Sequence, residues 1–140
     1  MSQENVGVVR EVYRCGERRD WDRLAELFDR DAEQHGTVGG LEEGFVARGV
    51  DEIRQVLENA EEAWDEQWVE PEKFIDAGDQ VVVFQREYQR GKTSRIELAA
   101  DTAAVLDLRD GRIVRVQGFM DRAAALAAAG LSGARRSADS

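Results

Sequence analysis

The sequence predicts an α+β domain with helices in its first half and a curved antiparallel sheet in its second. Apolar residues recur at helical spacing up to about residue 64, and they alternate with a period of two from about residue 68. Short glycine-containing turns separate the extended segments. Helices followed by an antiparallel meander are typical of the α+β class. We therefore expect three N-terminal helices packed on the sheet and one short helix near the C-terminus.

Three helical segments can be placed before the sheet. The first covers residues 4–15 and is expected to end at Gly16, because glycine commonly follows the last helical residue. The second covers 21–28, and Asp20 in front of it is a residue type that caps helix N-termini. The third, 50–64, has the clearest helical period.

Strands and turns fill the remainder of the chain. A glycine-rich segment, 36–49, reads as a long loop after a short strand at 32–35. Asp121 is placed to cap a last helix over 122–129. Four longer strands are expected at about 68–76, 80–89, 94–109 and 112–120.

Side-chain alternation divides the last two strands into two faces. Their even-numbered residues are mostly apolar or small, so we assign the even positions to the helix-covered face. A three-residue turn ending at Gly111 keeps both even sets on that face. Small residues there leave volume unfilled, which predicts a pocket. These small residues are Ala100, Thr102, Ala104 and Gly118.

The same alternation assigns the even positions of the strand 80–89 to the pocket. Arg86 and Tyr88 would then point toward the small residues, whereas a bulge in the strand would turn them outward. A buried guanidinium needs an anionic partner. We therefore expect Arg86 to contact a carboxylate-bearing ligand, unless it pairs with a glutamate of the chain or faces solvent.

Composition excludes several classes of function. The net charge of −10 repels phosphate backbones, which argues against nucleic-acid binding. One cysteine and one histidine cannot form a structural zinc cluster, and the carboxylates of 51–76 read as a solvated helix face, so we expect no metal and no cofactor. No apolar run reaches the roughly 18 residues of a membrane span, and the N-terminus lacks a secretory signal pattern. We expect a cytoplasmic protein with one domain over 1–131 and a flexible tail over 132–140.

Three segments carry a resemblance to a known family. They read Phe-Ile-Asp-Ala-Gly-Asp-Gln-Val-Val-Val (74–83), Leu-Arg-Asp-Gly-Arg-Ile-Val (108–114) and Met-Asp-Arg-Ala-Ala-Ala-Leu (120–126). With the order of helices and strands, the chain from about residue 4 to residue 131 resembles the SnoaL-like family of the nuclear transport factor 2-like, or ketosteroid isomerase-like, superfamily. The resemblance implies a cone-shaped α+β fold with an interior pocket and dimers formed through the sheet. The superfamily includes isomerases, polyketide cyclases, epoxide hydrolases and members that only bind.

The residues of the ketosteroid isomerase site do not carry over to this sequence. The aspartate base of that site falls on Gly36, its tyrosine near Val12 and its protonated aspartate on Ala104. Tyr13 is one residue from the tyrosine position, about 100° around the helix, and is not expected to replace it. Polyketide cyclases of the family use a pocket aspartate, for which Asp121 is the nearby candidate.

Two residues are candidate acid–base groups. His35 lies at the pocket end of the first strand and would titrate near neutrality; the alternative is a structural or surface histidine, with Gln34 facing inward. Asp121 is either an acid–base group or only a helix cap. Aromatic residues could floor the pocket or belong to the core. The candidate ligand contacts are Arg86, Tyr88, Thr102, Trp64, Trp68 and Met120.

Two functions fit these observations. The first is binding of a small molecule in an apolar pocket without chemistry, and the second is a cofactor-free isomerase, cyclase or hydrolase that acts by acid–base chemistry. Two titratable groups within hydrogen-bond reach inside the pocket would favour the enzyme. The other sheet face, to which we assign Val81 and Val83, mixes apolar and charged residues and predicts a homodimer.

Overall fold

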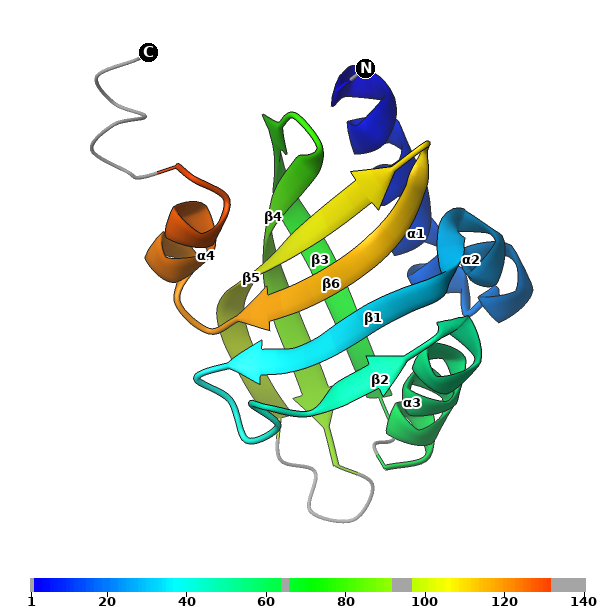
Figure 1. Cartoon of the computed structure of the whole chain (residues 1–140). Helices are drawn as coiled ribbons and strands as arrows, with labels where there is room; N and C mark the ends of the chain where they lie inside the picture. Colours follow the sequence, from blue (N-terminus) through cyan, green and yellow to red (C-terminus); the bar gives the residue numbers. More distant parts are fainter. Residues whose placement is uncertain (1, 64–65, 92–96, 132–140) are drawn as a thin grey trace.

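A six-stranded sheet in the order β2-β1-β6-β5-β4-β3 forms the framework of the molecule (Figure 1). The structure is a computed structural model, and it describes residues 2–63, 66–91 and 97–131. The strands are β1 (Phe28–Val38), β2 (Val46–Arg48), β3 (Glu66–Ala77), β4 (Gln80–Arg90), β5 (Glu97–Arg109) and β6 (Arg112–Phe119). The helices are α1 (Ser2–Arg18), α2 (Trp21–Leu27), α3 (Val50–Ala63) and α4 (Arg122–Ala128).

The sheet is mixed, which corrects the expectation of a fully antiparallel sheet. β1 runs parallel to β6, with Gln34 beside Val116, while the other neighbouring strands are antiparallel. β1 is also longer than the short strand expected at 32–35. A parallel partner that is distant in the chain leaves no hairpin pattern in the sequence. The α+β class itself is confirmed.

Helix ends follow capping chemistry. The side chain of Asp20 accepts a hydrogen bond from the backbone of Arg23 at 3.2 Å, so it caps α2 as predicted. Asp121 caps α4 in the same way. The predicted end of the first helix at Gly16 is wrong, because α1 continues to Arg18. The residue with left-handed backbone at this helix end is Arg19, with a φ of 57°.

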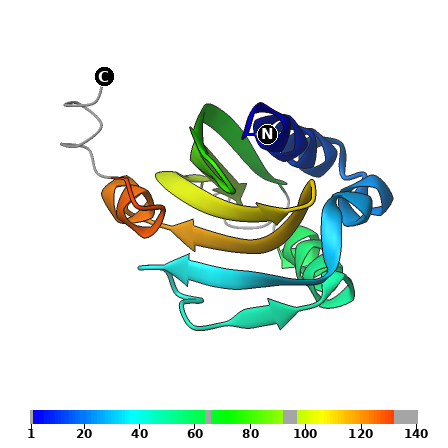
Figure 2. The same cartoon turned by 45° about the horizontal axis from the view of Figure 1, so that its top comes forward.

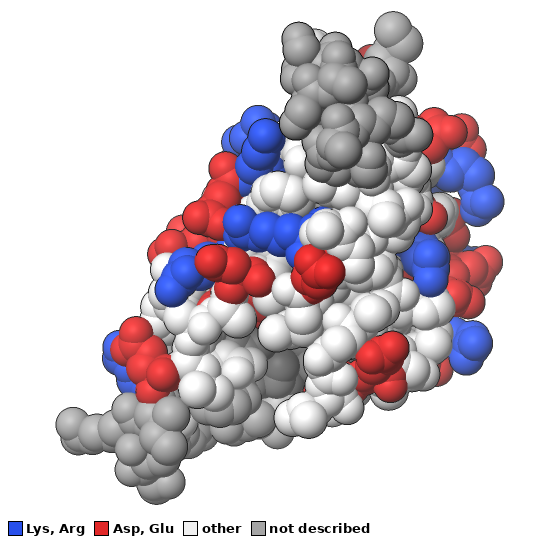
Figure 3. Space-filling view, turned by 90° about the vertical axis from the view of Figure 1, so that its left-hand side faces the viewer, with Lys and Arg blue, Asp and Glu red and all other residues white. Residues whose placement is uncertain are grey.

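Helices cover both faces of the sheet, as Figure 2 shows. We call the face that packs against α1, α2 and α3 the inner face, and the opposite face, against which α4 packs, the outer face. Figure 3 shows the side of the molecule that carries α4, where charged side chains of both signs stand among uncharged ones. The inner core includes Val81, Val83, Ala104, Leu106 and Ile113. The outer core includes Val82, Ala103, Val105, Phe119 and Ala125.

The turn between β5 and β6 has two central residues, not the three predicted. Asp110 and Gly111 have φ values of 54° and 77°, as a type I′ turn requires. A register shift next to Asp107 then restores the alternation. Ala104 therefore lies opposite Gly118. The inner face holds the even residues of β5 and, beyond the shift, Val116 and Gly118 of β6, whereas before the shift the odd residue Ile113 takes the inner position.

Strand β4 has the opposite alternation from the prediction. Gln85 pairs with Thr102 of β5, so the odd residues of β4 share the inner face with the even residues of β5. Arg86 and Tyr88 lie on the outer face, and their predicted orientation toward the pocket is wrong. The valines at 81–83 are all fully buried because both faces of the sheet are covered there. A continuous apolar run does not reveal which positions face inward.

Candidate functional site

A cavity of about 340 Å³ lies between the inner face of the sheet and helices α1, α2 and α3. Its size is within the range of small-molecule pockets in proteins. Ala104 and Gly118, two of the small residues from which a pocket was expected, border this cavity. Its apolar wall includes Leu24, Phe28, Ile53, Leu57, Leu106 and Val116.

Three of the polar side chains that border the cavity, Tyr13, Gln85 and Glu87, form a hydrogen-bonded group with Thr102. We call these four residues the polar cluster. Tyr13 comes from α1, Gln85 and Glu87 are two residues apart on β4, and Thr102 lies opposite Gln85 on β5. Residues two apart on a strand share a face, so the strand pairing brings three of the four together. Gln85 and Thr102 are only 8% and 1% exposed. The other two side chains border the cavity together with Gln85.

The hydrogen bonds of the polar cluster lead from the Tyr13 hydroxyl, through Gln85 and Thr102, to the carboxylate of Glu87. The Tyr13 hydroxyl donates to Oε1 of Gln85 at 2.5 Å. Nε2 of Gln85 donates to Oγ1 of Thr102 at 3.2 Å and to Oε2 of Glu87 at 3.4 Å. The Thr102 hydroxyl donates to the same Glu87 oxygen at 2.5 Å. Within the described residues, Oε1 of Glu87 accepts no hydrogen bond, so it is the acceptor available to a ligand.

The phenol of Tyr13 remains protonated over the neutral pH range. Its removal from water raises the pKa of Tyr13 above the usual value of about 10, and the charge of Glu87 raises this pKa further. Tyr13 is therefore a hydrogen-bond donor to Gln85 and not an acid–base group at neutral pH. Glu87 is the titratable group of the polar cluster that is left for proton transfer.

The raised pKa of Tyr13 predicts a loss of stability at alkaline pH. Above about pH 10 the unfolded chain releases the phenolic proton while the folded chain retains it, so the free energy of unfolding falls as pH rises toward the folded pKa. We expect this fall to be less steep for Tyr13→Phe, measured by urea denaturation at a series of alkaline pH values. Equal slopes for the two proteins would contradict the assignment.

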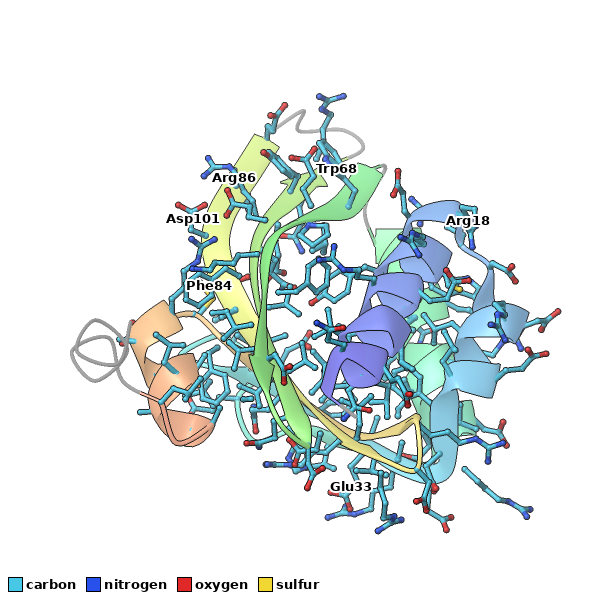
Figure 4. The ribbon with its side chains drawn as sticks, turned by 90° about the horizontal axis from the view of Figure 1, so that it is seen from above. Arg18, Glu33, Trp68, Phe84, Arg86 and Asp101 are labelled. Atoms are coloured by element: carbon cyan, nitrogen blue, oxygen red, sulfur yellow. The ribbon has the colours of Figure 1, made fainter. Side chains whose placement is uncertain are left out.

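Arg86 lies on the outer face, where it pairs with a residue of the chain and not with a ligand in the cavity. Its guanidinium is 2.6 Å from a carboxylate oxygen of Asp101, and Figure 4 shows this pair on the side of the sheet turned away from α1. The guanidinium also lies 5.6 Å from the centre of the Tyr88 ring. The expected contact between Arg86 and a ligand carboxylate inside the pocket is therefore wrong.

Arg86→Ala is expected to have little effect on stability or on the cavity. Exposed ion pairs are screened by water, so we expect the Tm to shift by less than about 2 °C in differential scanning calorimetry. Asp101→Ala, the other half of the pair, is the matched control and should behave alike. A large loss of Tm in Arg86→Ala alone would show that the guanidinium has another role.

Of the two candidate acid–base residues, His35 borders the cavity and Asp121 does not. The imidazole of His35 is 2.9 Å from Glu33, two residues away on the same strand, and Figure 4 places Glu33 on the outer side of the sheet. Gln34 holds the inward position beside Val116, although the strand borders the cavity at both 34 and 35. Asp121 caps α4 and is not among the residues that border the cavity.

The other predicted contacts are divided between the two faces. Trp68 is among the residues that border the cavity, but its indole stacks on Tyr88, with ring centroids 4.8 Å apart, on the outer face. Thr102 acts through its hydrogen bonds within the polar cluster. Met120 is 43% exposed beyond the end of β6, so its expected position on the pocket face is wrong. Trp64 lies outside the described residues.

Sequence reasoning missed three members of the polar cluster: Tyr13, Gln85 and Glu87. Gln85 and Glu87 were assigned to the wrong face because the valine run before them shows no alternation. A signal was nevertheless present. A glutamine and a glutamate two residues apart, directly after a buried run, are a polar pair on one face of a strand, and such a pair next to a core needs partners.

Comparisons with known proteins agree with this architecture. No curated protein matches the chain. TerC, co-crystallised with polyporic acid, is 23% identical, with 86% of this chain and 94% of that chain covered and a TM-score of 0.73. A nuclear transport factor 2-like protein of unknown function from Burkholderia pseudomallei is 24% identical over 91% of this chain and 97% of that chain, with a TM-score of 0.75. A protein from Catenulispora acidiphila with a ketosteroid isomerase-like fold, in complex with trimethylamine, is 20% identical over 89% and 92% of the two chains, with a TM-score of 0.71.

These likenesses show that the chain has the nuclear transport factor 2-like fold. In the part of the chain that the structure describes, no helix is long and apolar enough to cross a membrane, and no three His, Cys, Asp or Glu side chains could jointly hold a metal ion. The model of the SnoaL-like domain matches residues 9–116. Because that match extends from α1 to β6 and includes every element that borders the cavity, the chain belongs to the SnoaL-like family.

Proposed function

We propose that the chain binds a small, largely apolar molecule in the cavity and that the polar cluster orients it. One observation carries the proposal: Glu87 presents an acceptor oxygen without a partner among the described residues, at the wall of a mostly apolar cavity. A polar group away from bulk water is costly unless it is partnered. A few fixed polar groups in an apolar concavity are the usual composition of a small-molecule site.

Two structural neighbours support this proposal, because each is described together with a small molecule. TerC was co-crystallised with polyporic acid, and the Catenulispora acidiphila protein is in complex with trimethylamine. The two compounds differ in charge and size, so the likeness supports binding of a small molecule and does not choose its chemistry. The choice depends on the residues that line the cavity of this chain.

Filling the cavity tests the proposal. Ala104 borders it from β5, so Ala104→Leu places an isopropyl group inside. With benzyl alcohol as the probe, we expect wild-type protein to show saturable amide shifts in NMR spectra around β4 and β5. Ala104→Leu should bind at least about tenfold more weakly, because the probe and the new side chain compete for one volume.

The matched control carries the same substitution away from the cavity. Ala128 is exposed on α4, so Ala128→Leu should bind benzyl alcohol like the wild-type protein. Equal binding by wild-type protein, Ala104→Leu and Ala128→Leu would place the probe elsewhere. That result would overturn the assignment of the cavity as the ligand site.

Acid–base catalysis by Glu87 is the second candidate function. The two oxygens of the Glu87 carboxylate have different surroundings, and this difference favours catalysis. Oε2 accepts hydrogen bonds from two donors, whereas Oε1 is available to accept a substrate proton. Catalysis ranks second because the other titratable group of the polar cluster, Tyr13, already donates its proton to Gln85. The test is deuterium uptake from D₂O into small cyclic ketones, followed by NMR. Uptake that wild-type protein catalyses and Glu87→Gln does not would support catalysis, and equal uptake would exclude Glu87.

We also propose a homodimer formed through the outer face. The face differs from the predicted set, because Val81 and Val83 belong to the inner core and Val82 to the outer core. Charged and uncharged groups are mixed there (Figure 3), as in moderately sized interfaces. The cytoplasmic location and the domain limits of 1–131, with the tail at 132–140, are further proposals from the sequence.

A further inference from the structure

We propose that the ligand of the cavity is a positively charged hydrogen-bond donor, an organic amine, and that Glu87 is its counter-ion. This inference rests on the proposed function and names the class of ligand that the cavity takes. It follows from a count of donors and acceptors in the polar cluster, from the balance of charge around Glu87, and from the aromatic residues of the wall.

The donors of the polar cluster are fully used. Tyr13 and Thr102 each have one hydroxyl proton and the amide of Gln85 has two, so Tyr13, Thr102 and Gln85 supply four donors. Four hydrogen bonds are formed, one by each proton, and all of them end within the polar cluster. At the polar cluster a ligand therefore meets acceptors only, namely Oε1 of Glu87 and the lone pairs of the Tyr13 oxygen.

The orientation of the Gln85 amide is fixed by its neighbours. If the amide were turned over, its oxygen would face the carboxylate oxygen of Glu87, and two acceptors would be in contact without a proton between them. In the observed orientation the amide nitrogen faces Glu87 and Thr102, and the amide oxygen accepts from Tyr13. The charge of Glu87 therefore sets the direction of these donors, and the polar cluster leaves no donor for an anionic ligand.

Among the described residues, no cation balances the charge of Glu87, which has no ion-pair partner there. The other charged residues that border the cavity include Glu17 and Arg19, which have opposite signs and lie together at the end of α1. Arg86 is the cationic residue nearest to Glu87 in the sequence, and it forms an ion pair with Asp101 on the outer face. A carboxylate ligand at the polar cluster would meet a like charge, whereas an ammonium group would neutralise it.

The remaining wall suits the organic part of an amine. The aromatic residues that border the cavity include Tyr13, Trp21 and Phe28. Aromatic rings attract cations that carry apolar groups, and they also bury the hydrocarbon portion of a ligand. The cavity therefore combines the negatively charged carboxylate of Glu87, which can accept a hydrogen bond, with walls that favour an alkyl or aryl substituent.

A matched set of probes tests this inference. Benzylamine is cationic at pH 7, benzyl alcohol is neutral and benzoate is anionic, while all three share one ring. We expect isothermal titration calorimetry in 0.15 M salt to show benzylamine binding at least about tenfold tighter than benzyl alcohol, because charge-assisted hydrogen bonds are about twice as strong as neutral ones. Benzoate should bind most weakly of the three.

Substitution of the carboxylate provides the second measurement. Glu87→Gln retains an oxygen that accepts from Thr102 and removes the charge. We expect this variant to lose the preference for benzylamine over benzyl alcohol, because the charge that distinguishes the two probes is gone. Glu70→Gln is the control, because it removes the same charge from the exposed face of β3 and should keep the preference. The ratio of the two affinities reports on charge recognition, which a purely structural role of Glu87 would not change.

The outcomes separate the two proposals. If benzoate or benzyl alcohol binds as tightly as benzylamine and Ala104→Leu abolishes that binding, the cavity is a ligand site and the inference about amines is overturned. If none of the three probes binds, the proposed function falls and the inference falls with it. The comparison of probes on wild-type protein decides this even if Glu87→Gln does not fold.

Discussion

Gln85→Leu is expected to lower the free energy of unfolding by about 2–3 kcal/mol, measured by urea denaturation at pH 7. Gln85 takes part in three of the four hydrogen bonds of the polar cluster. Leucine has a similar size but no polar atoms. The substitution leaves the Tyr13 hydroxyl without its acceptor and removes one donor each from Thr102 and Glu87. Buried groups that lose a partner retain their cost of leaving water, which is why the effect is large.

A double substitution separates this cause from simple loss of packing. Tyr13→Phe removes the hydroxyl that Gln85→Leu leaves without a partner. The double variant Tyr13→Phe/Gln85→Leu should therefore be more stable than the sum of the single effects predicts, by about 1 kcal/mol. Strict additivity would show that the contact between Tyr13 and Gln85 does not couple the two residues.

Gly36→Ala is expected to lower the free energy of unfolding by about 2–3 kcal/mol, because the added carbon has no room. A Cβ at Gly36 would lie 1.8 Å from the backbone oxygen of Glu42. Gly36 is also held on both sides, since its N–H donates to Phe45 and its carbonyl accepts from Gln117, each at 2.8 Å. The turn between β1 and β2 would have to move away from the strand. Thermal unfolding followed by circular dichroism measures the loss.

Gly7→Ala is the matched control for Gly36→Ala. Gly7 lies within α1, and no heavy atom lies within 4 Å of the Cβ that this substitution would add. Alanine in a helix interior is more stable than glycine by roughly 0.5–1 kcal/mol, so this variant should gain stability. If Gly36→Ala were as stable as the wild-type protein, the close approach of the turn to β1 would be refuted.

Features that depend on near neighbours in the chain were predicted well from the sequence. The second helix and its Asp20 cap, the cap at Asp121, the even inner face of β5, and the inner positions of Val116 and Gly118 are confirmed. Each depends on a few consecutive residues, where hydrogen bonding and alternation act directly. The β5–β6 turn has two central residues where three were predicted, but the bulge after it restores the alternation at Val116 and Gly118, on which the cavity depends.

Features that depend on distant partners were not predicted. The inward face of β4 is decided by its pairing with β5, because three consecutive buried valines fit either face. The polar cluster was missed for the same reason. Tyr13 was set aside because it is one position away from a tyrosine in related enzymes, yet its partner here is Gln85, which no positional comparison could reveal.

The parallel pairing of β1 with β6 constrains how the chain acquires its structure during synthesis. The paired residues Gln34 and Val116 are separated by most of the polypeptide, so this contact has a high sequence separation. Contacts of that kind are formed late and slowly, because a long loop must be closed first. β1 and β2 leave the ribosome early but have no sheet to join until β6 has been translated. An exposed strand edge then waits for its partner, and the interval before β6 emerges is the period in which the nascent chain is most open to aggregation.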